Sequence, residues 1–124
     1  MKRDVAVIIL YDSKKRILLQ SKKENQWQYF GGGIQNGESP ENAVKREAIE
    51  ELGYNLRDSK LIAKIPMRGR YEGHMDVFVE KYDGSKINLM EGKKLRWFDQ
   101  KQTDKLNMSE HDKEALKRFF DHVG

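Results

Sequence analysis

The chain has 124 residues, of which 37% are hydrophobic and 35% charged, and its formal net charge is +4. We expect a single domain spanning residues 1–124 around one core, with no room for a second domain. The absence of cysteine excludes disulfides, a thiolate metal site and a cysteine nucleophile, and agrees with a cytoplasmic location. The basic balance indicates attraction of anionic ligands.

The first part of the chain predicts strands. Residues 5–10 form an apolar run that is too short to cross a membrane and has no small-residue cleavage site after it. We therefore expect a buried strand there. A polar turn at 12–15 and a second strand at 16–20 come next, and a short aromatic strand at 27–30 leads into three glycines.

Residues 40–52 predict a helix. Ser39 is a good N-cap, Pro40 suits the first helical position, and Gly53 suits a left-handed residue after the end. At 100° per residue, one face is apolar and the adjoining face collects three carboxylates. These carboxylates belong to Glu47, Glu50 and Glu51.

The second half of the chain predicts further strands and one more helix. Alternating hydrophobic residues and turn signals place the strands at 60–66, 74–82, 86–89 and 95–98. A helix is expected at 109–122, with Ser109 as its cap. This order of elements predicts an α/β (α+β) fold in which a mixed sheet lies between helices.

The carboxylate face of the first helix indicates a cation site. Like charges at i, i+3 and i+4 repel one another by about a few tenths of a kcal/mol per pair. Oxygen ligands favour Mg²⁺, and Mn²⁺ also fits. The alternative is a solvated acidic face that is paired with Lys45 and Arg46.

The glycine loop and the helix together form one longer pattern. Gly32 is followed by five residues, Glu38, seven residues, and then residues 46–54, which read Arg-Glu-Ala-Ile-Glu-Glu-Leu-Gly-Tyr. This pattern resembles the signature of the Nudix hydrolases, which cleave a nucleoside diphosphate linked to another group, and no fixed residue is missing. Tyr54 stands where an aliphatic residue is usual, and Phe30 where many members have proline.

The resemblance implies a set of metal ligands. Glu50 and Glu51 are expected to hold Mg²⁺ or Mn²⁺, and the backbone carbonyl of Gly31 is a further expected ligand. Glu47 is either another ligand or the acceptor of a proton from the attacking water.

Three other charged residues are assigned supporting or catalytic roles. Arg46 is expected to brace the glutamates, and Glu38 to orient Arg46. Glu91 lies ahead of a strand tryptophan, as in MutT-type members, which makes it a candidate ligand or general base. The alternative for Glu91 is an exposed loop residue, so the choice of base between Glu47 and Glu91 stays open.

Candidate substrate-binding residues lie outside the pattern. Tyr29 or Phe30 is a candidate for stacking on a base, although a buried core role is equally consistent with a strand. Asn107 and Met108 precede the last helix, where similar proteins place base-reading groups, and Glu110 and Asp112 open it.

Lys22 and Lys23 come after the second strand, at positions where similar proteins carry a phosphate-binding arginine. A lysine serves phosphate as a point charge. The alternative is a solvated surface.

The resemblance to the MutT-type branch implies a pyrophosphohydrolase that converts a nucleoside triphosphate, such as an oxidised purine nucleotide, to monophosphate and pyrophosphate. The alternatives are hydrolysis of dinucleoside polyphosphates, nucleotide sugars or RNA 5′ ends, and, in another class, a non-catalytic nucleotide-sensing module. The expected partner is a small nucleotide. No membrane and no stable nucleic-acid partner beyond an RNA 5′ end is expected, and the protein is expected to be a monomer or a homodimer.

Overall fold

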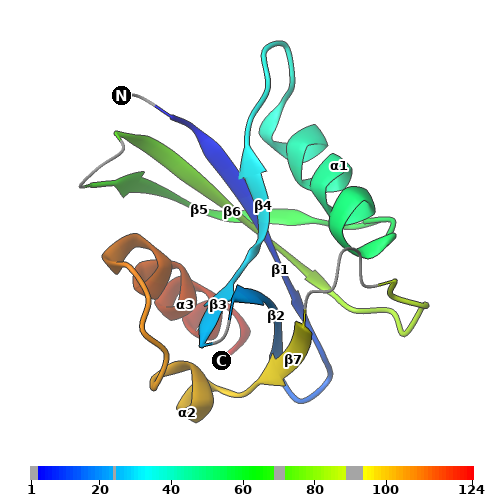
Figure 1. The fold of residues 1–124 in the computed structure, drawn as a ribbon, viewed down its shortest axis with the longest axis vertical. Helices are drawn as coiled ribbons and strands as arrows, with labels where there is room; N and C mark the ends of the chain where they lie inside the picture. Colours follow the sequence, from blue (N-terminus) through cyan, green and yellow to red (C-terminus); the bar gives the residue numbers. More distant parts are fainter. Residues whose placement is uncertain (1–2, 24, 69–71, 89–93) are drawn as a thin grey trace.

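The computed structural model describes residues 3–23, 25–68, 72–88 and 94–124 (Figure 1). Within these ranges a seven-stranded sheet runs in the order β3-β2-β1-β6-β5, with β4 paired to β1 and β7 paired to β2. The strands are β1 (Val5–Tyr11), β2 (Ile17–Lys23), β3 (Gln26–Gln28), β4 (Phe30–Gly33), β5 (Lys60–Met67), β6 (Gly73–Lys81) and β7 (Lys94–Phe98). The helices are α1 (Pro40–Leu52), α2 (Gln100–Thr103) and α3 (Glu110–Val123).

Strand β1 lies at the centre of the sheet. It is parallel to β6 along its whole length, and antiparallel to β4 in its first half and to β2 at its end. Strands flank it on both sides and helices cover both faces, so Ala6, Ile8, Ile9 and Leu10 have no exposed surface. A mixed sheet between helices confirms the fold class expected from the sequence.

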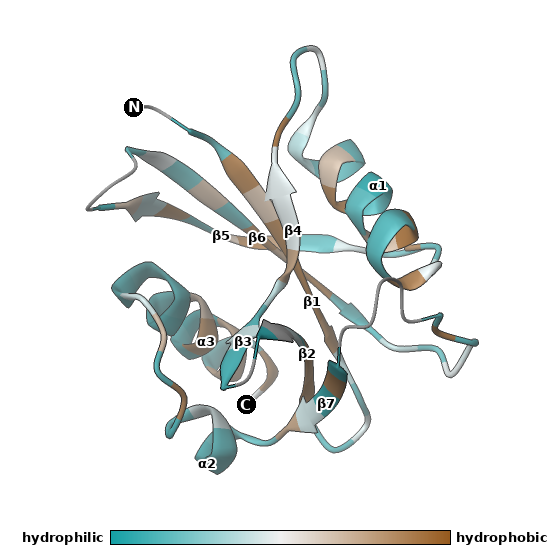
Figure 2. Ribbon diagram, in the orientation of Figure 1, coloured by the Kyte–Doolittle hydropathy of each residue, from teal (hydrophilic) through white to brown (hydrophobic). Residues whose placement is uncertain are grey.

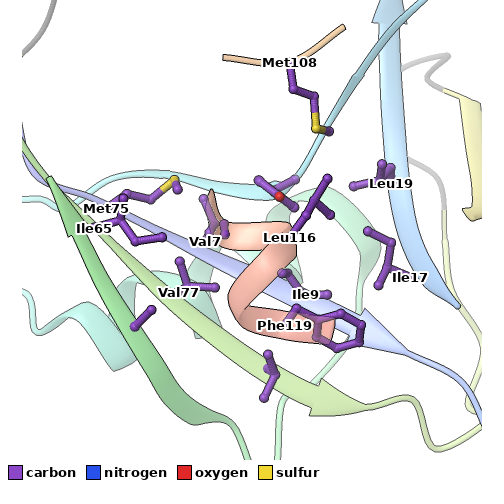
Figure 3. Packing of buried hydrophobic residues seen from close by; sticks show 14 of the residues in the cluster. Val7, Ile9, Ile17, Leu19, Ile65, Met75, Val77, Met108, Leu116 and Phe119 are labelled. Carbon is purple, nitrogen blue, oxygen red and sulfur yellow. The ribbon is translucent and has the colours of Figure 1, made fainter. Parts of the chain in front are cut away.

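Two hydrophobic clusters form the core, one on each face of the sheet. Successive side chains of a strand point to opposite faces. Val7 and Ile9 of β1 therefore pack with Phe119 of α3 (Figure 3), while Ile8 packs with Val44 of α1. Figure 2 shows the hydrophobic β1 crossing the sheet between two helices that carry many hydrophilic residues.

The structure confirms the helix at 40–52 and corrects two expected strands. Residues 27–30 are not one strand, because the chain changes partner at Tyr29: β3 pairs with β2, and β4 pairs with β1. Residues 86–88 are not in a strand, and position 89 lies outside the described residues. Helix α2 was not expected from the sequence. A capping box formed by Asp99 and Gln102 stabilises its start.

Among the described residues, no helix combines the length and the apolar character that crossing a bilayer requires.

Candidate functional site

Helix α1, which carries the glutamates, lies beside β4 (Figure 1). The Ser39 hydroxyl accepts a hydrogen bond from the backbone N–H of Asn42 at 3.1 Å, and Pro40 occupies the first turn. Gly53 ends the helix with φ of 63°, in the left-handed region that favours glycine. The apolar face of α1 is buried against the sheet, which fixes the adjoining carboxylate face above β4.

Glu51 is buried and held from two sides. Only 8% of its surface is exposed. Oε1 accepts the backbone N–H of Gly31 on β4 at 2.9 Å, and Oε2 accepts a hydrogen bond from the side-chain amide of Gln20 on β2. The same Gln20 nitrogen donates to the carbonyl oxygen of Tyr29 at 3.3 Å. These donors satisfy a carboxylate that has left bulk water and fix its orientation.

Glu47 lies next to Glu51. Burial raises the pKa of Glu47, the neighbouring Glu51 raises it further, and the Arg46 guanidinium opposes both effects. A Cβ atom at Gly32 would lie 2.9 Å from Oε1 of Glu47, so a larger residue there would require the Glu47 carboxylate to shift.

Arg46 connects the helix to the glycine loop. Its Nε and Nη2 form a fork on the Glu38 carboxylate at 2.8 and 3.1 Å. Nη1 donates to Glu47 at 3.1 Å and to Glu50 at 3.2 Å, and Nη2 donates to the Gly33 carbonyl at 3.3 Å. The hydrogen bonds from Arg46 lower the pKa of Glu38, and the same fork raises the pKa of Arg46. These are the contacts expected of a bracing residue.

The donor set fits a hard divalent cation. The carboxylates offer only oxygen ligands, which suits Mg²⁺ and Mn²⁺. A cation beside Glu47 and Glu51 would remove the repulsion that raises the pKa of Glu47. Glu50 is 56% exposed and turned toward Arg46. Within the described part of the chain, no three acidic or histidine side chains are gathered as a complete metal site, and Glu50 contacts Arg46.

A cavity of about 220 Å³ opens next to the glycines, and its wall includes Gly31 and Gly32. Tyr29 forms another part of the wall, and its hydroxyl donates to the backbone carbonyl of Asp112 on α3 at 2.7 Å. Burial raises the pKa of Tyr29 and of Asp112, although nearby His111 partly opposes the shift of Asp112. The cavity therefore extends from the glycines, which adjoin the carboxylates of α1, to the start of α3.

Of four residues expected to bind substrate, only one lies in the wall of this cavity. Tyr29 lines the cavity. Phe30 is fully buried in the core on the α1 face, which agrees with the alternative core role and leaves no exposed ring for stacking on a base. Met108 is buried in the opposite cluster and Asn107 is exposed, and neither belongs to the cavity wall. The expectation that these two residues read a base does not match this cavity.

Other expected residues are placed only in part. Lys23 is exposed at the end of β2. The side chain of Lys22 and the whole of Glu91 lie outside the described residues. The amide of Gly31 contacts Glu51, while the ligand role of its carbonyl stays a prediction.

Three residues of the site were missed from the sequence. Gln20 follows the apolar residues 17–19 of β2 and precedes polar ones, so the sequence gives no sign that it is buried, and only the structure shows that this buried polar side chain has a partner. Arg3 and His111 line the cavity but lie far from the glycine loop along the chain, so no local pattern connects them to it.

Comparison with known proteins agrees with this geometry. A sequence model of the NUDIX domain matches residues 1–119. An RNA pyrophosphohydrolase of Mannheimia succiniciproducens is 34% identical over 92 residues, which is 73% of this chain and 45% of that protein. The chain spans about half the length of the curated relatives it matches.

Solved structures show the same fold. The MutT protein of Methanosarcina mazei superposes with a TM-score of 0.82 at 18% identity, covering 98% of this chain and 95% of that one. The MutT protein of Bacillus halodurans gives a TM-score of 0.75 at 27% identity, covering 93% of this chain and 80% of that one.

Proposed function

Because the chain belongs to the Nudix family, we propose that it hydrolyses a phosphoanhydride bond in a nucleoside diphosphate-linked substrate, with Mg²⁺ or Mn²⁺ as cofactor. One observation carries the proposal: the buried Glu51 and its neighbour Glu47 face the glycine loop beside a cavity. A structural acidic patch would be expected at the solvated surface, where carboxylates are cheaply hydrated.

The residues of the site have separate tasks. A bound divalent cation neutralises phosphate charge and lowers the pKa of a water nucleophile. Glu47, Glu50 and Glu51 would hold it, and Arg46 would keep Glu47 and Glu50 in place. Glu47 stays a candidate for either ligand or proton acceptor, and Glu91 stays a second candidate for the base.

The first candidate substrate is a nucleoside triphosphate, which would be cleaved to monophosphate and pyrophosphate. Tyr29 gives the cavity an aromatic wall for a base, and Arg3 adds a cation near the glycine loop for phosphate. The fold shared with MutT proteins supports this interpretation.

The second candidate substrate is the 5′ end of RNA. It is favoured by the curated relatives, which are named RNA pyrophosphohydrolases. Both substrates present the same triphosphate to the glutamates. They differ beyond the first nucleotide, where RNA continues as a chain and the free nucleotide ends.

A non-catalytic sensing module is the candidate from another class. Such a module has no need for a complete carboxylate set, whereas Glu47, Glu50 and Glu51 are all present here. Retention of all three favours catalysis.

A product screen tests the proposal. The protein with Mg²⁺ or Mn²⁺ is incubated with ordinary and oxidised nucleoside triphosphates and with 5′-triphosphorylated RNA. Pyrophosphate and the matching monophosphate are then quantified, with Glu51→Gln as the background. Release above this background from at least one substrate supports the proposal. Its absence from all of them with both metals overturns both candidate substrates, and its absence from dinucleoside polyphosphates and nucleotide sugars as well overturns the proposal.

A further inference from the structure

A second concave surface lies away from the glutamates. Two cavities of about 440 and 490 Å³ share Gln100 and Phe120 in their walls. They are therefore adjacent, and together they make a concave surface bordered by α2, α3 and the turn between β1 and β2. In Figure 1 these borders lie in the lower half of the molecule, away from α1. We call this surface the lysine groove, after the side chains that line it: Lys14, Lys15, Lys101, Lys113 and Lys117.

The groove has an excess of positive charge. Its described walls hold five lysines against two aspartates, Asp99 and Asp104. Asp99 is already used in capping α2, where it accepts the backbone N–H of Gln102 at 2.8 Å. Among the described residues, Lys113 is the one lysine of the five within 4 Å of a carboxylate, that of Glu110 at 3.8 Å. The other four ammonium groups are available to an anion.

The turn that carries two of these lysines is held by hydrogen bonds to one side chain. Oδ1 of Asp12 accepts the backbone N–H groups of Lys14 and Arg16 at 3.0 and 2.8 Å, and Oδ2 accepts Nε of Arg16 at 2.7 Å. Lys15 has φ of 63°, a left-handed conformation that is rare for residues other than glycine, asparagine and aspartate. These hydrogen bonds hold the turn in a defined shape that presents Lys14 and Lys15 at the edge of the groove.

The floor of the groove is apolar. Leu106 and Leu116 line one half, Val123 lines the other, and Phe120 lies between the two halves. The Phe120 ring is partly exposed, although it packs edge to face on Phe119. Single-stranded nucleic acids combine phosphate contacts with bases stacked on such rings.

We propose that the lysine groove binds single-stranded RNA, with the lysines on phosphates and Phe120 against a base. An acidic peptide would satisfy the charge but would leave the aromatic ring without a partner of matching shape. This proposal departs from the expectation that the protein has no nucleic-acid partner beyond an RNA 5′ end.

RNA binding in the groove would extend the proposal that the 5′ end of RNA is the substrate, and in this respect it rests on the proposed function. Helix α3 carries Asp112 in the wall of the cavity next to the glycines, and Phe120 in the wall of the groove. Eight residues separate them, which corresponds to about 12 Å along the helix axis. An RNA molecule whose 5′ end lies in the cavity therefore has a nearby surface for its later nucleotides.

Fluorescence anisotropy with a labelled 12-nucleotide RNA tests the groove. The RNA carries a 5′-hydroxyl, so it is not a substrate, and no divalent metal is added. The groove variant is Lys15→Gln/Lys101→Gln/Lys117→Gln. The matched control, Lys60→Gln/Lys81→Gln/Lys86→Gln, removes the same charge from exposed positions elsewhere. Phe120→Leu is measured separately, and thermal unfolding checks that every variant is folded.

We expect the groove variant to weaken RNA binding at least tenfold and to reduce the slope of log K against log salt by about 2, since each lost phosphate contact contributes about 0.7. The control variant should stay within twofold of wild type, and Phe120→Leu should weaken binding with an unchanged slope. Equal losses in the groove and control variants would mean that net charge alone attracts RNA, which overturns the proposal. Tighter binding of a labelled polyglutamate peptide than of RNA would also overturn it.

Turnover separates this proposal from the proposed function. The groove variant should hydrolyse a nucleoside triphosphate at the wild-type rate, because its lysines lie outside the glutamate site. If no substrate is hydrolysed but RNA binding still depends on the groove lysines, the proposed function fails and the groove assignment stands.

Discussion

The side-chain amide of Gln20 on β2 donates a hydrogen bond to the carboxylate of Glu51 on α1. The same nitrogen contacts the carbonyl of Tyr29, whose hydroxyl reaches α3. One buried amide thus joins Glu51 on α1 to Tyr29 in the wall of the cavity. The Gln20 Oε1 atom is buried without a hydrogen-bond partner in the described structure, so the hydrogen bonds of this side-chain amide are those donated by its nitrogen.

Gln20→Met should reduce both stability and metal affinity. The thioether fills similar volume but donates nothing, which leaves the buried Glu51 without one of its donors and costs about 1–3 kcal/mol. Urea unfolding and a Mn²⁺ titration followed by electron paramagnetic resonance measure the two effects. Leu18→Met, on the same face of β2, is the control and should cost less than about 1.5 kcal/mol. Unchanged Mn²⁺ affinity in the Gln20 variant would contradict a positioning role.

Glu50→Gln and Glu51→Gln should both lower turnover by orders of magnitude but should differ in stability. Glu50 is exposed, so its variant should unfold within about 0.5 kcal/mol of wild type. Glu51 accepts hydrogen bonds at both oxygens, and an amide replaces one acceptor with a donor, at a cost of about 1–3 kcal/mol. Glu41→Gln, on the exposed side of α1, is the control. Near wild-type rates in both variants at saturating Mg²⁺ would instead favour the sensing module.

Hydrolysis should require Mg²⁺ or Mn²⁺ and disappear with a chelator. Metal should also stabilise the folded protein, by about 2.7 kcal/mol at a hundred times its dissociation constant. Thermal unfolding with and without Mg²⁺ measures this effect independently of turnover. Ca²⁺ is expected to bind without supporting turnover, since it tolerates looser geometry than Mg²⁺. Undiminished turnover in excess chelator would rule out the metal assignment.

Arg46→Lys should reduce turnover and destabilise the protein, even though it keeps the charge. A lysine cannot make the fork on Glu38 while also contacting Glu47. The expected loss is about 1–3 kcal/mol, because these are charge-assisted and partly buried contacts. Arg118→Lys is a control, since Arg118 makes an exposed pair with Glu114. If the two variants lose equal stability, the bracing role of Arg46 is wrong.

Tyr29→Phe should cost about 0.5–1.5 kcal/mol, since it removes the hydrogen bond to the Asp112 carbonyl. It should also raise KM for a nucleotide substrate if α3 shifts away from the cavity. Tyr11→Phe is the control, because no hydrogen bond of the Tyr11 hydroxyl to a described residue is present. Steady-state kinetics and urea unfolding test both variants. If the Tyr29 variant behaves like the control, the hydrogen bond to Asp112 has no role in holding α3 at the cavity.

The sequence by itself determined the helix and its carboxylate face. Capping residues, apolar spacing and carboxylate spacing are local properties, so residues 40–52 and the shared face of Glu47 and Glu51 could be predicted from them. The contacts of Arg46 with Glu38 and Glu50 were also foreseeable, because α1 and its preceding loop are neighbours along the chain.

The tertiary structure alone decided which residues surround that chemistry. The change of strand partner at Tyr29 sends its ring to the α3 face and buries Phe30 on the α1 face. Gln20 meets Glu51 across 31 positions, and Asp112 meets Tyr29 across 83. Such contacts depend on sheet register and helix docking, which arise when distant segments bury their apolar faces together, and no local pattern encodes them.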